Sequence, residues 1–134
     1  TFSLKGRHYS VQDLDAQPKP ISRPRLLLGG GGGRRSLALA ARYADEYNVY
    51  DMSEDQLRDI RSGLDDACKH EGRDPDTLPL SLMDTVDKAP TEQVVARYRK
   101  LESIGVTRVM LQHLQHEDLE TVEWIGRELT PALA

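Results

Sequence analysis

Strand-like and helix-like segments alternate along this chain from residue 25 to its end, and the alternation limits the folds that it can adopt. Each helix-like segment carries apolar residues at helical spacing, and four short apolar runs suit strands, at residues 25–28, 47–50, 78–86 and 107–112. Alternating strands and helices specify parallel strands with helices packed outside them, joined by right-handed crossovers. We therefore predict an α/β fold of four β/α units over residues 25–134, with the first strand buried on both faces.

Capping signals mark the ends of the predicted helices. The stretch from Ser53 to Gln56 matches the capping box that opens a helix. Gly72 stands at the expected end of that helix, and Gly105 ends the next one. A last helix is predicted to stop before Pro131, and its apolar stripe consists of Leu119, Val122, Ile125 and Leu129.

Residues 1–24 show little regular pattern. Pro18, Pro20 and Pro24 favour extended or turn backbone. We expect this segment to form a lead-in loop that crosses the surface, and we treat residues 25–134 as the structural domain.

Composition is that of an ordinary globular protein and argues against several classes of function. The chain has 134 residues, 38% of them hydrophobic, and a formal net charge of −4. That charge, with no basic cluster beyond Arg34 and Arg35, disfavours a nucleic-acid binder. No apolar run approaches the roughly 20 residues that span a bilayer. Cys68 is the single cysteine, so no internal disulfide forms, which fits a cytoplasmic protein.

A run of five glycines between the first predicted strand and its helix is the sharpest candidate site. Glycine lets backbone approach a ligand closely, and free N–H groups at a helix start attract anions. We predict a cradle for a cofactor phosphate, made of Gly29, Gly30, Gly31, Gly32, Gly33, Arg34, Arg35 and Ser36. The alternative is a flexible turn that binds nothing. The run is no Walker loop, because no Gly-Lys-Ser/Thr follows it, and no acidic residue completes a Rossmann fingerprint.

Residues at the ends of the other predicted strands are further candidates for ligand contact. In β/α barrels, active residues lie at the carboxyl ends of the strands. Here those ends carry Asn48, Tyr50, Asp51, Met83, Asp84, Thr85, Gln112 and His113. For each of them the alternative is a solvated loop residue. His113 and His116 lie three residues apart, but no third His or Cys accompanies them, so we predict no metal site.

Several stretches of the chain resemble the luciferase-like monooxygenase family. They are Lys5 to Tyr9, Pro18 to Pro20, Arg23 to Gly33, Leu37 to Asp45, Cys68 to Pro75 and Ile104 to Val109. They occur in the family's order and sample most of the chain. Three positions depart from the family's pattern: Ser22 stands where Gln is common, and Glu46-Tyr47 replaces the usual Gly-Trp.

The resemblance implies a TIM (β/α)8 barrel that uses FMN or a deazaflavin coenzyme of the F-420 type, with the glycine run beside the cofactor phosphate. A full barrel needs about 250 residues, so this chain corresponds to its C-terminal half. We expect a fragment or truncated form of a flavin- or deazaflavin-dependent oxidoreductase or monooxygenase acting on a small organic substrate, with its catalytic residues unassigned. The alternative is a non-catalytic half-barrel module for assembly or ligand binding.

Half a barrel leaves two sheet edges unpaired and one sheet face uncovered. Apolar strand residues left in water cost about 25 cal/mol per Å². We therefore expect the face to be covered by a missing N-terminal half, by a second copy in a homodimer, or by residues 1–24.

Overall fold

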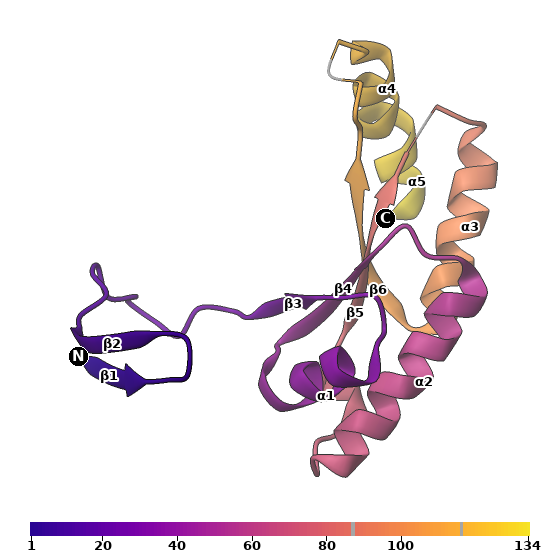
Figure 1. Cartoon of the computed structure of the whole chain (residues 1–134). Coiled ribbons are helices and arrows are strands. Elements are labelled where there is room, and N and C mark those ends of the chain that lie inside the picture. The colour runs from indigo at the N-terminus through magenta and orange to yellow at the C-terminus, as the bar shows by residue number, and fades with distance from the viewer. Residues whose placement is uncertain (87, 116) are drawn as a thin grey trace.

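The computed structural model describes residues 1–86, 88–115 and 117–134 (Figure 1). One sheet of four strands forms its centre, in the order β3 (Leu27–Gly29), β4 (Glu46–Tyr50), β5 (Leu80–Thr85) and β6 (Val106–Gln112). Each strand pairs in parallel with the next one along the chain. The predicted α/β fold of four β/α units is therefore confirmed.

Helices connect the strands and cover one face of the sheet, where α2 and α3 run alongside it in Figure 1. Their bounds are α1 (Arg34–Tyr43), α2 (Glu54–His70), η1 (Pro75–Thr77), α3 (Thr91–Ile104), α4 (Leu119–Trp124), η2 (Ile125–Leu129) and α5 (Thr130–Leu133). The predicted capping box is confirmed, because Ser53 and Gln56 exchange both of its hydrogen bonds. No helix among the described residues combines the length and apolar character needed to cross a membrane.

The hydrophobic core lies between the sheet and these helices. Because side chains alternate along a strand, every second residue of the inner strands faces the helices. Tyr47 and Val49 of β4 and Leu80 and Leu82 of β5 are at most 1% exposed. Full burial of a large aliphatic side chain contributes roughly 1.5–3 kcal/mol, so this layer is the main source of stability.

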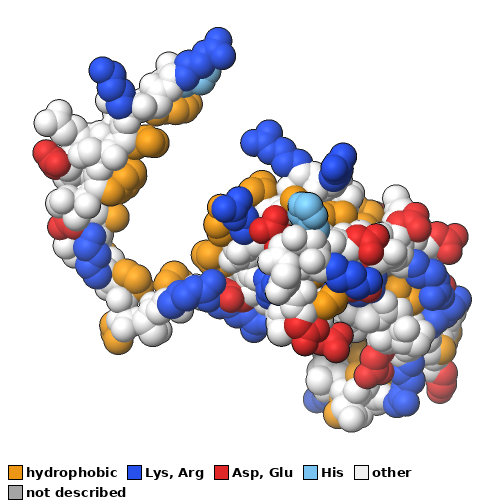
Figure 2. All heavy atoms as spheres, turned by 90° about the horizontal axis from the view of Figure 1, so that it is seen from below, with side chains coloured by type: hydrophobic (Ala, Val, Ile, Leu, Met, Phe, Trp, Pro, Cys, Tyr) orange, Lys and Arg blue, Asp and Glu red, His pale blue; other side chains and the backbone are white. Residues whose placement is uncertain are grey.

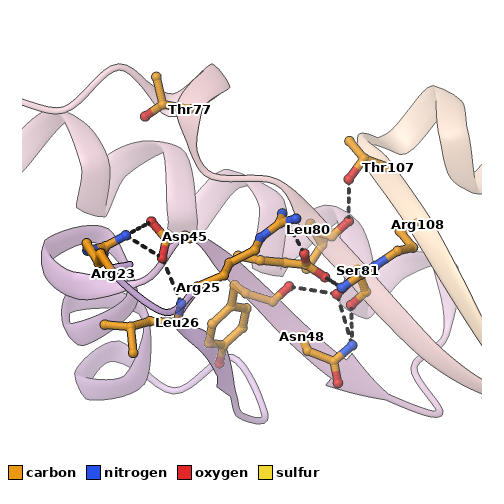
Figure 3. Close-up of polar contacts among 12 residues, drawn as sticks. Arg23, Arg25, Leu26, Asp45, Asn48, Thr77, Leu80, Ser81, Thr107 and Arg108 are labelled. Carbon is orange, nitrogen blue, oxygen red and sulfur yellow. Dashed lines mark hydrogen bonds and ion pairs between the residues drawn. The ribbon is translucent and has the colours of Figure 1, made fainter. Parts of the chain in front are cut away.

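The opposite face of the sheet is polar near the amino ends of its strands (Figure 3). The buried Glu46 carboxylate pairs with Arg108 and, at 2.8 Å, with Arg25. One residue pair further along, the Asn48 amide donates to the Ser81 hydroxyl at 3.0 Å. At these positions the face carries paired charges and hydrogen-bonded amides, which tolerate burial, in place of the exposed apolar residues that we expected.

Strand β3 is more exposed than predicted. Leu26 and Leu27 each keep 46% of their surface exposed, so the prediction of a first strand buried on both faces is wrong. The strand lies at one edge of the sheet and pairs with β4 alone among the strands that the structure describes. A parallel strand is buried on both faces only where neighbouring layers cover both.

Residues 1–24 contain a β-hairpin, where we expected only a loop. Its antiparallel strands are β1 (Phe2–Lys5) and β2 (Ser10–Leu14). The register places Phe2 opposite Leu14 and Leu4 opposite Val11, which gives the hairpin one apolar face. The hairpin projects from the body of the molecule. Hydrophobic side chains line the side of the hairpin that faces the space between it and the rest of the molecule (Figure 2). It therefore does not fold over the bare face of the sheet.

The predicted apolar stripe of the last helix is confirmed in part, because Leu129 is fully buried and Ile125 packs against the core. Leu119 and Val122 are 72% and 53% exposed, whereas Thr121 and Trp124 are nearly fully buried. Residues three apart share a helix face, so burial of the large Trp124 indole also turns Thr121 inward. Val122 then lies about 100° away around the helix and points outward.

Pro131 does not end this helix either. It lies in the first turn of α5, a position at which proline is tolerated because its missing N–H is not needed. The π-helical turn η2 precedes it, and the Thr130 hydroxyl donates to the carbonyl of Ile125 at 2.8 Å.

Arg73 connects the end of α2 to the end of α1. Its Nη1 donates to the carbonyls of Ala44 at 2.7 Å and Ala41 at 3.2 Å. A cation there satisfies the free carbonyls at the helix end and interacts favourably with the helix dipole. Gly72 permits this contact, because its φ of 68° turns the chain sharply after α2.

Asp84, near the end of β5, is buried against α3. Its carboxylate pairs with the Arg97 guanidinium and accepts a hydrogen bond from the Tyr98 hydroxyl at 3.1 Å. Burial, and then the negative charge of Asp84, raise the pKa of Tyr98 far above its ordinary value, so the hydroxyl stays a donor. At 2% exposure, the carboxylate depends on these two partners.

Substitution of Arg97 tests this dependence. Arg97→Ala should lower the free energy of unfolding by about 2 kcal/mol, since hydrogen bonds to charged groups contribute roughly 1.5–3 kcal/mol. Urea denaturation followed by circular dichroism measures the change. Arg99→Ala is the matched control on the same helix, because Arg99 donates to the carbonyl of Ala132 at 3.5 Å, near the limit for a hydrogen bond. Equal stability of the two variants would show that the ion pair adds nothing.

Candidate functional site

The glycine loop (Gly29–Gly33) lies at the carboxyl edge of the parallel sheet. Gly29 pairs in register with Asn48 of β4, and the Gly30 N–H donates to the Asn48 carbonyl at 3.1 Å. The chain then leaves the sheet and enters α1 at Arg34. Ligands of open parallel sheets and barrels bind at this edge, so the loop occupies the position that we predicted for it.

The glycines of the loop have two different structural roles. A Cβ at Gly30 would overlap the Tyr47 hydroxyl, and one at Gly32 would come within 2.6 Å of Ile60. Gly32 also has a φ of 79°, which side chains other than glycine rarely adopt. A Cβ at Gly31 or Gly33 would meet no atom within 4 Å. Gly30 and Gly32 thus serve packing, whereas Gly31 and Gly33 leave open space above the loop.

The start of α1 has the donor set of an anion site. Gly33 is its N-cap, and among the described residues no side chain caps this end. The first turn holds no acidic residue but begins with the exposed pair Arg34 and Arg35. Uncapped N–H groups and the positive end of the helix dipole favour a phosphate, and guanidinium groups add charge-assisted hydrogen bonds. The residues present therefore fit a cofactor phosphate.

Ser36 differs from its neighbours in this predicted site. Its hydroxyl donates to the Gly33 carbonyl at 2.8 Å and lies 2.9 Å from the Tyr47 hydroxyl. The hydroxyl therefore bonds inside the loop and is not a free donor toward the open side.

Two predicted residues of the other strands lie on the uncovered face of the sheet near its carboxyl edge. Tyr50 ends β4 and Thr85 ends β5, and their hydroxyls are 3.4 Å apart. Asp51 follows with a φ of 47°, and its N–H donates to the carbonyl of Met83 at 3.0 Å. Gln112 ends β6 in register with Thr85. These polar groups occupy the edge at which a ligand of the glycine loop would meet the sheet.

Other predicted residues point elsewhere. Asn48 is buried below the edge, where it bonds to Ser81. Asp84 faces α3 on the helix side of the sheet. His113 follows the end of β6, and its Nε2 lies 3.9 Å from the Asp118 carboxylate. Side-chain alternation explains the separation, because Thr85 and Asp84 are adjacent and so lie on opposite faces. The sequence pattern identified the strand ends but not the face of each residue.

Asp118 caps the final helix near this edge. Its carboxylate accepts hydrogen bonds from the hydroxyl and N–H of Thr121, and these bonds hold the pKa of Asp118 below its usual range. The predicted pair of His113 and His116 cannot be compared with the structure, because His116 lies outside the described residues. Within those residues no cluster of three or more His, Cys, Asp or Glu side chains could hold a metal ion.

A groove of about 540 Å³ runs between α1 and α2, and it borders the glycine loop at Gly32 and the start of α1 at Arg34. Its remaining lining belongs to the outer helix layer, including Leu37, Gly63 and His70. The polar groups at the ends of β4 and β5 lie on the other face of the sheet. A ligand in this groove could contact the loop but not those groups.

The predicted site omitted Tyr47, which lies beneath the glycine loop and accepts a hydrogen bond from the Gly32 N–H at 3.1 Å. The signal for it was present as a departure from the family pattern, where Trp is usual. A buried hydroxyl in place of an indole brings an acceptor that an indole lacks.

One comparison with a solved structure agrees with this architecture. That structure is described as an F420-dependent secondary alcohol dehydrogenase in complex with an F420-acetone adduct. It superposes with a TM-score of 0.81 at 13% identity, and the alignment covers 99% of this chain and 56% of that one. DmoA from Hyphomicrobium sulfonivorans aligns over 75% of this chain and 22% of its own, at 22% identity and a TM-score of 0.47. No curated protein gives a significant match.

The superposition on the alcohol dehydrogenase concerns the fold, because the identity is low. This chain spans 56% of the length of that solved chain, so its four β/α units correspond to part of a barrel. The family model for luciferase-like monooxygenases matches residues 1–132. With nearly its whole length matched and the corresponding partial barrel in place, this chain belongs to the luciferase-like monooxygenase family.

Proposed function

We propose that this chain acts as the C-terminal half of a flavin- or deazaflavin-dependent oxidoreductase, and that its glycine loop binds the cofactor phosphate. One observation carries the proposal: an uncapped helix start without acidic residues follows two open glycines at the carboxyl edge of the sheet. Membership of the family and the F420-dependent enzyme among its structural neighbours support a cofactor of this class.

In this proposal the phosphate is held by the N–H groups of the loop and of the first turn of α1, together with Arg34 and Arg35. Gly31 and Gly33 admit it, because neither carries a side chain on the open side. When bound, a reduced flavin or deazaflavin would supply hydride transfer to a small organic substrate, or activation of oxygen. Tyr50 and Thr85 would contribute hydroxyls at the same edge of the sheet.

The second candidate function is a non-catalytic half-barrel module. The uncovered sheet face favours it, because this face would line a barrel interior, and the helices of the described residues pack on the other face. In such a module the loop would remain as a turn whose glycines serve packing alone. Binding of the cofactor distinguishes the two candidates.

Titration with FMN and with the deazaflavin coenzyme tests the cradle. The purified chain should bind one of them, with a change in cofactor fluorescence. Gly31→Leu should fold and weaken binding about tenfold or more, since charge-assisted hydrogen bonds contribute roughly 1.5–3 kcal/mol each and 1.4 kcal/mol is tenfold in affinity. Gly126→Leu is the matched control, because a Cβ at Gly126 also meets no atom within 4 Å and lies in the final helix.

Absence of binding at millimolar concentrations of both cofactors would favour the module. Equal affinities of Gly31→Leu and Gly126→Leu for the cofactor would show that the chain binds the cofactor but that the cofactor phosphate does not lie at the glycine loop. Gly30→Leu is unsuitable for this experiment, because it would displace Tyr47 and disturb the fold of the loop itself.

The bare sheet face also leads us to propose self-association when no other polypeptide covers it. Within the described residues, β3 and β6 are the two edges of the sheet and have no strand paired on their outer side. The hairpin exposes Phe2 and Leu4 at 54% and 55%. A homodimer would bury part of this surface. Size-exclusion chromatography with light scattering at micromolar concentration should give twice the mass of the chain, and a stable monomer would contradict the proposal.

A further inference from the structure

Tyr47 reaches the glycine loop from below. It is the second residue of β4, its side chain is fully buried on the helix side of the sheet, and its hydroxyl ends between Gly32 and Ser36. The absence of a Cβ at Gly30 makes room for that hydroxyl. Apolar packing needs only the ring, so the hydroxyl calls for a separate explanation.

The direction of each hydrogen bond around this hydroxyl follows from the chemistry of its partners. The Gly32 N–H can only donate, so Tyr47 accepts from it at 3.1 Å. The Gly33 carbonyl can only accept, so the Ser36 hydroxyl donates its one proton to this carbonyl, at 2.8 Å. Tyr47 must then donate its own proton to Ser36, at 2.9 Å.

The result is one directed chain of hydrogen bonds, from the Gly32 N–H through Tyr47 and Ser36 to the Gly33 carbonyl. It joins the two residues at which the loop turns into α1, and each hydroxyl in it donates once and accepts once. Gly32, at which this chain of hydrogen bonds begins, has a φ of 79°. With the inner groups paired to each other, the N–H groups of the first turn of α1, which no described side chain caps, remain for a ligand.

We propose that Tyr47 is a positioning residue: its hydroxyl holds the glycine loop in the conformation that receives the cofactor phosphate. This inference rests on the proposed function of the loop. A flexible glycine run loses conformational entropy when it closes on an anion, and this loss weakens binding. A loop that is already ordered before binding avoids most of the loss. Tyr47 therefore increases the contribution of the phosphate to the binding affinity and leaves the contribution of the cofactor's ring system unchanged.

Comparison of FMN with riboflavin separates these two parts, since riboflavin lacks the phosphate. Tyr47→Phe should weaken FMN binding by about tenfold, as expected for loss of one or two neutral hydrogen bonds, and leave riboflavin affinity unchanged. If the chain binds the deazaflavin coenzyme instead, the coenzyme and its phosphate-free chromophore form the equivalent pair. Fluorescence titration measures all four affinities.

Ser36→Ala provides a second variant in case Tyr47→Phe fails to fold. It removes the middle of the same chain of hydrogen bonds, and alanine suits the first turn of a helix. It should also weaken FMN binding and spare riboflavin. Tyr43→Phe is the matched control, because Tyr43 lies at the far end of α1 with 53% of its surface exposed.

The outcomes distinguish this inference from the proposed function. If the wild-type chain binds neither phosphorylated cofactor, the proposed function fails and the inference falls with it. If the wild-type chain binds FMN and Tyr47→Phe binds it equally well, the inference alone is overturned. Parallel loss of FMN and riboflavin affinity would also overturn it, because Tyr47 would then act only by supporting the fold.

Discussion

The parallel register between β3 and β4 is the constraint on which the candidate site depends. It places Gly29 beside Asn48 and lets the Gly30 N–H bond to the Asn48 carbonyl, so the glycine run begins where the sheet ends. A slip of one residue would turn Tyr47 from the helix side to the open side of the sheet. The loop would then lose its internal hydroxyl, and α1 would start in a different direction. The burial of Tyr47 and Val49 under the helices opposes that slip.

Much of this fold could be predicted from local pattern, because strand runs, capping residues and terminal glycines act over a few neighbours. The Ser53 capping box is one example. Features that depend on distant contacts were predicted less well. The exposure of Leu27 depends on β3 lying at the sheet edge, and the exposure of Val122 depends on which side Trp124 turns inward. The sequence did not predict the hairpin, because its strands are short and carry few apolar residues.

The polar face of the sheet shows the same limit in the candidate site. Glu46 reads in sequence as a departure from a usual glycine, with no partner suggested by spacing. In the structure it is buried between Arg25, which lies 21 residues before it in the sequence, and Arg108, which lies 62 residues after it. A carboxylate in that position is tolerated only because both guanidinium groups are present. Pairing over such separations follows from the strand order, so it could be recognised only after the sheet was known.

The glycine run shows why a motif can be recognised before its residues are understood. In sequence the five glycines are equivalent, and all of them were assigned to the cofactor. The structure separates four of them by what lies where a Cβ would stand: a tyrosine hydroxyl at Gly30, an isoleucine at Gly32, and open space at Gly31 and Gly33. Gly30 and Tyr47 form a matched pair, since the hydroxyl enters only because the glycine has no side chain. The departure at Tyr47 and the glycine run are therefore one feature, in which a buried hydroxyl replaces part of the rigidity that glycine gives up.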